Sequence, residues 1–216
     1  MGAACRTDVL NKTPKTLAIR EVLSNRFGVG NSTFRLGVDK VMDVETVPFG
    51  CWRRKVFEKY GYYDERLIRN QDIELNKRII HGGGRICIVP ETYCTYLARE
   101  TFKGLARNNF SNGKWNVLTV YYTRQLKSLS VRHFIPLVFL LSLLLPLFAA
   151  LFYLPFAFLS FLSLLSYLLV LFCISMSINL RSKISISYLL LSFVVLHLSY
   201  GYGSLVGIYK CIGYGK

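Results

Sequence analysis

Acidic side chains are missing from the second half of this 216-residue sequence. All 12 Asp and Glu residues lie at or before Glu100, and the stretch from Phe134 to Tyr209 contains only Arg181 and Lys183 as fixed charges. A single soluble domain would spread its charges along the whole chain, so this distribution excludes one. The sequence predicts a soluble first half and an apolar, membrane-embedded second half.

The six cysteines form no C-x-x-C pair, and Cys173 lies inside an apolar run. This spacing lacks the common zinc-site and disulfide patterns, so we expect reduced cysteines that serve only in packing. The first residues lack the basic and apolar regions of a secretory signal peptide, and Arg6 stands where N-myristoylation requires Ser or Thr. We therefore expect neither targeting device.

Positive charge dominates the sequence, with a formal net charge of +15 at pH 7. Residues 101–133 carry basic side chains and no acidic ones, and they directly precede the apolar half. Anionic lipid headgroups, and the excess of Lys and Arg on the cytoplasmic side of membranes, account for such a segment. We therefore expect a membrane partner, no nucleic-acid partner, and a soluble portion that lies in the cytoplasm.

Residues 100–133 also interleave apolar and aromatic side chains with Lys and Arg at helical spacing. This pattern is typical of amphipathic helices that lie in the membrane interface. We predict interfacial helices here, between a soluble region at residues 1–99 and a transmembrane region of about three spans at residues 134–209.

The first apolar run, from Phe134 to Met176, is too long for one crossing. As a single helix it would extend about 65 Å, roughly twice the ~30 Å hydrocarbon core of a bilayer. We predict two spans, with Pro155 near the turn between them.

A third span is predicted at residues 184–209 and is followed by a basic tail at residues 210–216. It contains Gly203-x-x-x-Gly207, a spacing that permits close helix packing. A third crossing would place the basic tail on the non-cytoplasmic side. A multi-pass protein with three full spans and one with a re-entrant third segment both remain open.

Carboxylates and amides crowd the start of one predicted helix, within residues 61–78. Asn70 occupies the N-cap position, Asp72 and Glu74 fall in the first turn, and the glycines at 82–84 end the helix. Acids at a helix start commonly do no more than complement the helix dipole. Taken alone, this stretch indicates a well-capped surface helix.

The order of residues around this helix resembles the G-x-F-D-E … E-D-x-D-L-x-x-R … G signature of family 2 glycosyltransferases. In this chain the signature reads Gly61-x-x-Asp64-Glu65, then Gln71-Asp72-x-Glu74-Leu75, then Arg78 and the glycine run. Gln71 replaces the usual Glu, and Glu74 replaces the usual Asp. This variant is associated with the membrane-bound, succinoglycan-type branch of exopolysaccharide transferases.

The resemblance implies an α/β fold at residues 1–99, namely the C-terminal half of a GT-A-like nucleotide-sugar transferase domain. The segment Phe27–Arg35 is similar to an F-G-x-G-N-S-x-F-R segment of the same branch. Periodicity and turn residues predict helices at residues 15–26, 52–59 and 71–81, and strands at residues 38–47 and 85–90. Because the family's nucleotide pocket precedes this region, we expect a C-terminal fragment or one piece of a split enzyme, unable to bind donor unaided.

The resemblance also implies site residues. Asp72 would be the base that takes the proton from the acceptor hydroxyl in an inverting transfer from a nucleotide-sugar donor. An Asp with an ordinary pKa near 3.9 is already ionised at pH 7, so the role of base requires no special tuning. Arg69 is a candidate for pairing with phosphate. Contacts to a glycan or lipid-linked acceptor are expected from Phe49, Gly50, Gln71, Lys114 and Trp115.

Lys114 and Trp115 stand where processive relatives carry Q-x-x-R-W and retain only its basic and aromatic ending. A Trp that anchors the chain at the membrane interface, beside a Lys that reaches toward the headgroups, is the open alternative.

A divalent cation, Mg²⁺ or Mn²⁺, is implied for the intact family enzyme, where a D-x-D motif holds it on the donor diphosphate. Asp43-Val-Glu45 has this spacing but lies downstream of the usual position, so we interpret it as a pair of exposed strand acids and assign no metal ligand. The competing hypothesis is a non-catalytic, membrane-anchored remnant or assembly subunit. An upstream reading frame that encodes a D-x-D motif would favour the transferase.

Three further features are interpreted as structural. The glycine loop at Gly28–Gly30 has no preceding strand and no following Gly-Lys-Ser/Thr, which indicates a plain turn. His81-Gly-Gly-Gly84 lacks the G-x-S-x-G partner that an esterase needs. His197, inside the third apolar run, is interpreted as an interior hydrogen-bonded residue.

Overall fold

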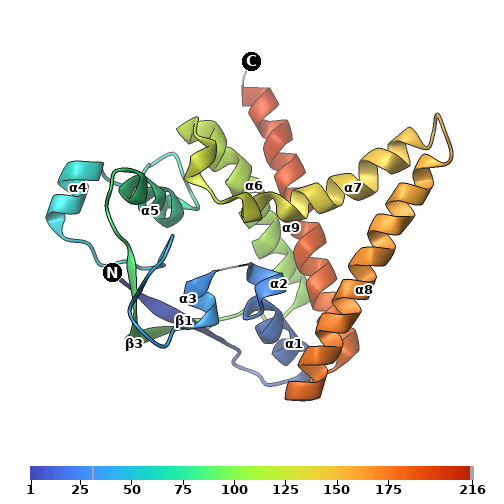
Figure 1. Ribbon diagram of the computed structural model, residues 1–216, viewed down its shortest axis with the longest axis horizontal. Coiled ribbons are helices and arrows are strands. Elements are labelled where there is room, and N and C mark those ends of the chain that lie inside the picture. The colour runs from blue at the N-terminus through green and yellow to red at the C-terminus, as the bar shows by residue number, and fades with distance from the viewer. Residues whose placement is uncertain (31, 215–216) are drawn as a thin grey trace.

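The computed structural model describes residues 1–30 and 32–214 and is 64% helical. A small sheet region lies on one side of the molecule, and the hairpin of α7 (Ile135–Ala149) and α8 (Phe156–Ser182) lies on the other (Figure 1). Between them lie α6 (Phe102–Thr123) and α9 (Ile186–Tyr214). The predicted order, an α/β region followed by apolar helices, is confirmed.

Three strands form the sheet in the described part of the chain, in the order β1–β3–β2. β1 (Gly2–Asp8) runs parallel to β3 (Cys87–Leu97), and β2 (Met42–Asp43) pairs antiparallel with the other edge of β3. The sequence did not predict β1, because its small and polar residues have low strand propensity. Pairing with β3, far away along the chain, is what makes this segment a strand.

The two predicted strands have different limits in the structure. The strand expected at residues 38–47 pairs only at Met42–Asp43, and the strand expected to end at Pro90 continues to Leu97. Proline has no N–H for the ladder, and the pairing with β1 shifts here, from Ala3 opposite Val89 to Ala4 opposite Tyr93. This irregularity carries β3 past the proline.

Helices α4 (Arg54–Tyr60) and α5 (Gln71–His81) lie close to their predicted positions. One face of α5 covers the sheet, where Leu75 and Ile79 join a buried cluster with Ile86 and Ile88. This packing fixes the start of α5, where Asp72 lies.

The helix predicted at residues 15–26 is divided in the structure. α1 (Pro14–Leu23) begins at the N-cap Thr13, and Asn25 caps a separate short helix, α2 (Arg26–Val29). α3 (Thr33–Leu36) follows. Ile19 of α1 packs in one core cluster with Phe193 of the last helix, so the N-terminal region lies directly against the apolar half.

Residues 100–133 form one long helix rather than several. α6 (Phe102–Thr123) is followed by two 3-10 turns, η1 (Leu126–Ser128) and η2 (Val131–Phe134). α6 lies beside α9 (Ile186–Tyr214) (Figure 1).

Glycines allow the backbones of α6 and α9 to approach closely. A Cβ at Gly203 would lie 2.0 Å from the Phe110 carbonyl oxygen, and one at Gly207 would lie 2.8 Å from that of Lys114. The close-packing prediction for these glycines is confirmed, and the partner is α6.

Among the described residues, three helical segments are long and apolar enough to cross a membrane, as predicted, namely Val131–Ala149, Phe156–Ser182 and Ile186–Gly213. α7 (Ile135–Ala149) and α8 (Phe156–Ser182) form a hairpin. The hydroxyl oxygens of Ser142 and Ser163 form a hydrogen bond of 2.7 Å between the two helices, and Pro155 immediately precedes α8. In an apolar stretch of 18 residues, only 6% of the residues are buried in Val131–Ala149 and in α8, against 44% in α9. The hairpin therefore exposes its apolar surface, whereas α9 is partly enclosed by the rest of the chain.

Candidate functional site

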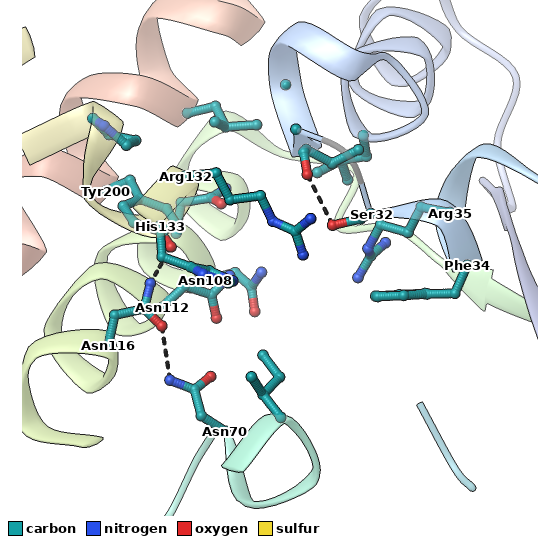
Figure 2. A pocket seen from close by; sticks show the side chains of 18 of the residues that line it. Ser32, Phe34, Arg35, Asn70, Asn108, Asn112, Asn116, Arg132, His133 and Tyr200 are labelled. Atoms are coloured by element: carbon teal, nitrogen blue, oxygen red, sulfur yellow. Dashed lines mark hydrogen bonds between the residues drawn. The ribbon is translucent and has the colours of Figure 1, made fainter. Parts of the chain in front are cut away.

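A cavity of about 1010 Å³ opens where the α/β region, α6 and the apolar helices meet. Figure 2 shows side chains that converge on it from the α2–α3 segment, the start of α5, α6 and the segment before α7. Four of the predicted site residues line it, namely Phe49, Arg69, Gln71 and Asp72. The cavity is therefore the part of the molecule in which the predicted chemistry comes together.

Asp72 is the one carboxylate in the described lining of this cavity. Its Oδ1 accepts a hydrogen bond of 2.9 Å from the Ile73 N–H, and no described Lys or Arg forms an ion pair with it. Burial raises the pKa of Asp72 above its ordinary value, against the lowering effect of its backbone hydrogen bonds. The surroundings of this carboxylate therefore shift its pKa, although an Asp with the ordinary pKa would also be ionised at pH 7.

The start of α5 is tied to α6 by Asn70. Asn70 occupies the N-cap position as predicted, but its backbone is left-handed (φ 66°) and its side chain makes no cap hydrogen bond. Its amide donates instead to Asn116 Oδ1 at 2.8 Å and to Thr119 Oγ1 at 3.2 Å. Asn116 in turn donates to the Tyr200 hydroxyl on α9. These bonds connect the helix that carries Asp72 to the apolar half.

An amide-bearing face of α6 forms one wall of the cavity. Asn108, Asn112 and Asn116 are spaced four residues apart, so they share one side of the helix. Arg69 Nη1 donates to Asn112 Oδ1 at 2.5 Å and to Asn108 Oδ1 at 3.4 Å. This wall was not predicted from the sequence, although the four-residue spacing of the three Asn residues indicates a shared helix face.

Most of the charged side chains in the lining are arginines, namely Arg26, Arg35, Arg69 and Arg132. Burial, and then the nearby charge of Arg99, lowers the pKa of Arg69 below its ordinary value. With Asp72 as the lone acid, the cavity carries an excess of positive charge. An anionic group is the ligand chemistry that such a lining favours.

The segment Phe27–Arg35 contributes a second wall, which the interpretation of its glycines as a plain turn overlooks. Gly30 has a positive φ of 61°, and a Cβ there would lie 3.1 Å from Cδ of Arg132. The glycine thus makes room for the Arg132 side chain. The similarity of this segment to the glycosyltransferase branch was the signal that could have placed it in the site. Asn31 lies outside the described residues.

The side of the cavity formed by the long C-terminal helices is largely apolar. Ile135, Pro136 and Phe139 of α7 line it, together with residues of α8 and α9. His197 is buried there, with Nδ1 3.0 Å from the Tyr167 hydroxyl and Nε2 3.0 Å from the Phe27 carbonyl oxygen. The prediction of an interior hydrogen-bonded histidine is confirmed. The cavity therefore has a polar, cationic part and an apolar part.

Three predicted acceptor residues lie outside this lining, namely Gly50, Lys114 and Trp115. Gly50 lies against the Trp52 ring, which a Cβ would approach to 2.6 Å. Trp115 is buried in α6, and Lys114 Nζ is 5.9 Å from the centre of its ring. Phe49 lines the cavity with 87% of its surface exposed, which places it at the rim.

Glu74 and Arg78, also part of the glycosyltransferase-like signature, face away from this cavity. Arg78 pairs with Glu74 at 2.6 Å and donates to the carbonyl oxygens of Tyr60 and Tyr62. Together they hold the turn between α4 and α5, so we assign them a structural role.

The described residues do not fit a divalent cation of the D-x-D type. Asp43 is exposed as predicted and pairs with Arg85 at 2.8 Å, but Glu45 is half-buried and pairs with Lys77 and Arg132. In the described part of the chain, no three His, Cys, Asp or Glu side chains lie together as a possible metal site.

No protein-family model, curated protein or solved structure matches this chain. The interpretation of the site therefore depends on its residues and on the sequence signature.

Proposed function

We propose that this chain provides the acceptor side of an inverting glycosyltransferase in polysaccharide biosynthesis. The enzyme transfers a sugar from a nucleotide-sugar donor to a glycan or lipid-linked acceptor at the membrane. The observation that carries the proposal is the position of Asp72, the lone carboxylate of a cavity that is cationic on one side and apolar on the other. The family 2 signature around Asp72 gives independent support.

In the proposed reaction, Asp72 accepts the proton of the acceptor hydroxyl. The freed oxygen attacks the anomeric carbon of the donor sugar from the face opposite the diphosphate, which leaves with the bonding electron pair. The raised pKa of Asp72 increases the proton affinity of this base, which favours general-base catalysis. Gln71, which follows Asn70 at the helix start, is placed to orient the acceptor.

We assign the nucleotide and its divalent cation to a part of the intact enzyme outside the described residues. The cation would neutralise the departing diphosphate. The described residues of this chain hold the acceptor, position Asp72 and shield it from water.

We place the protein in the cell membrane as a multi-pass protein with its soluble portion in the cytoplasm. The apolar helices support the membrane location. The basic residues at 101–133, directly before the first apolar helix, support the orientation.

The test is sugar transfer to lipid extract in membranes that contain the chain, expressed with and without the polypeptide encoded immediately upstream. Radiolabelled UDP- and GDP-sugars serve as donors. Asp72→Asn is expected to lower transfer at least ~100-fold, the usual contribution of a positioned base. Asp39→Asn is the matched control, because Asp39 is exposed and outside the cavity, and it should keep transfer within about twofold. Transfer by Asp72→Asn equal to that of the control would leave a non-catalytic anchored subunit.

A further inference from the structure

Two arginines, from segments far apart in the sequence, converge on the cavity. Figure 2 shows the guanidinium groups of Arg35, in α3, and Arg132, in η2, directed into the space between them. Neither was expected as a site residue from the sequence. Their convergence concentrates positive charge at one place in the lining.

The two groups are held in different ways. Arg132 forms an ion pair with Glu45, which lies outside the cavity lining. Arg35 stacks over the Tyr96 ring, with Cζ 4.6 Å from its centre, and its Nη1 is buried without a hydrogen-bond partner among the described residues. A buried guanidinium N–H without an acceptor is costly, and an anion with several oxygens would satisfy it. Arg35 therefore has an N–H donor that an anionic ligand can satisfy.

Arg69, the phosphate candidate from the sequence, is less suited to this task. Its Nη1 already donates to Asn112 and Asn108. Arg69 shapes the amide wall, whereas Arg35 keeps a buried donor available.

The position of Arg132 relates the charged part of the cavity to the membrane. Arg132 lies three positions before Ile135, the first residue of α7, and Ile135, Pro136 and Phe139 continue the lining on the apolar side. An anion held by Arg132 would therefore lie at the level where a lipid headgroup meets the hydrocarbon region, and an attached apolar chain would have a surface to follow.

We infer that Arg35 and Arg132 bind the phosphate groups of a lipid diphosphate, whose apolar chain leaves over Ile135 and Phe139. The inference rests on the proposed function, since this lipid would carry the acceptor sugar toward Asp72. The diphosphate of a sugar nucleotide has the same chemistry, and the apolar continuation of the lining is what favours the lipid.

The test is binding of farnesyl diphosphate to the purified full chain in a neutral detergent, measured by isothermal titration calorimetry. We expect saturable binding that Arg35→Gln and Arg132→Gln each weaken at least tenfold, with partial rescue by Arg35→Lys. Arg54→Gln is the matched control, because Arg54 is an exposed arginine of α4 outside the cavity. Arg132→Gln also breaks the pair with Glu45, so circular dichroism must show the native helix content. If that variant does not fold, Arg35→Gln decides, because Arg35 has no ion pair among the described residues.

Competition experiments identify the source of the diphosphate. Farnesol and UDP are expected to displace farnesyl diphosphate only weakly. If farnesol binds as tightly as farnesyl diphosphate, the arginines do not contribute to binding. If UDP binds as tightly and the arginine variants lose that binding, the subsite belongs to the sugar-nucleotide donor. Unchanged affinity in both arginine variants would also overturn the inference.

This assay requires neither sugar transfer nor the donor half, so its failure is distinguishable from failure of the proposed function. Asp72→Asn should lose transfer but keep saturable binding of farnesyl diphosphate that still depends on Arg35. If the arginine variants lose binding but transfer does not need Asp72, the diphosphate subsite is retained and the role of Asp72 as base is rejected.

Discussion

Asn70 and Asn116 join the soluble region to the apolar half through a hydrogen bond of 2.8 Å between Asn70 Nδ2 and Asn116 Oδ1. Asn70 lies directly before α5 with a left-handed backbone. Asn116 lies in α6, and only 2% of its surface is exposed. The bond sets the orientation of the helix start that presents Asp72. Its removal should affect the site even though neither amide takes part in the proposed chemistry.

The left-handed backbone of Asn70 allows this bond to be tested separately from backbone strain. Asn70→Gly keeps the backbone conformation and removes the amide, whereas Asn70→Ala also introduces a strain of about 1 kcal/mol. We expect both variants to lower sugar transfer, and the Ala variant to unfold at a lower temperature than the Gly variant in thermal melts of the detergent-solubilised protein. A Gly variant with full transfer would show that the bond to Asn116 does not position Asp72.

The half-buried carboxylate of Asp72 should reduce stability at neutral pH. Its folded-state pKa lies above the ordinary value of 3.8, so ionisation costs the folded state more than the unfolded state. The cost is absent below about pH 3.8 and is fully present above the folded-state pKa. Asp72→Asn should therefore melt at a higher temperature than the unmodified chain at pH 7, and the difference should shrink as the pH falls toward 4. A variant that is less stable at pH 7 would contradict the role of burial.

Glu45 should show the opposite pH dependence. Burial alone would raise its pKa, but the Ser130 hydroxyl, Arg132 and Lys77 together hold the pKa below the ordinary value of 4.5. The stability contributed by Glu45 is therefore present above about pH 4.5 and is lost as the pH falls through the folded-state pKa.

Glu45→Gln removes the charge that these partners share. We expect a destabilisation of about 1–2 kcal/mol at pH 7, less than for a fully buried pair because Glu45 and Arg132 are partly exposed. Glu58→Gln is the control, since the Arg54–Glu58 pair is exposed and should contribute no more than about 0.5 kcal/mol. Chemical denaturation at pH 7 and at acidic pH gives both values. Equal effects of the two variants at pH 7 would show that Glu45 does not secure the segment before α7.

The contact between α6 and α9 depends on the absence of a side chain at Gly203. A Cβ there would lie 2.0 Å from the Phe110 carbonyl oxygen, so Gly203→Ala forces the two helices apart. We expect a loss of about 1–3 kcal/mol, typical of overpacking, and a lower melting temperature. Gly213→Ala, on the same helix, has no atom of the described residues within 4 Å of the new Cβ and should be neutral or slightly stabilising. Equal melting temperatures for the two variants would contradict close packing at Gly203.

Features encoded by local composition could be predicted from the sequence. The apolar helices follow from long runs of hydrophobic residues, and α5 follows from its periodic apolar residues and its glycine end. The α7–α8 hairpin follows from an apolar run that is too long for a single membrane crossing. None of these depends on a partner that is distant along the chain.

Features that depend on distant partners could not be predicted. β1 exists because β3 offers it an edge, and α6 is one continuous helix that packs on glycines of α9. Neither property is visible in the residues of β1 or of α6 considered alone. The raised pKa of Asp72 has the same origin, because burial depends on which segments close over the carboxylate.

The sequence by itself determined that an α/β region precedes apolar helices and that Asp72 stands at the start of a helix, since hydrophobic runs and helix signals act over a few neighbouring residues. Only the tertiary structure decided that Asp72 shares a cavity with Arg35 and Arg132. The physical reason is that burial, charge convergence and strand pairing arise between residues far apart along the chain, and these relationships exist only after folding has brought the segments together.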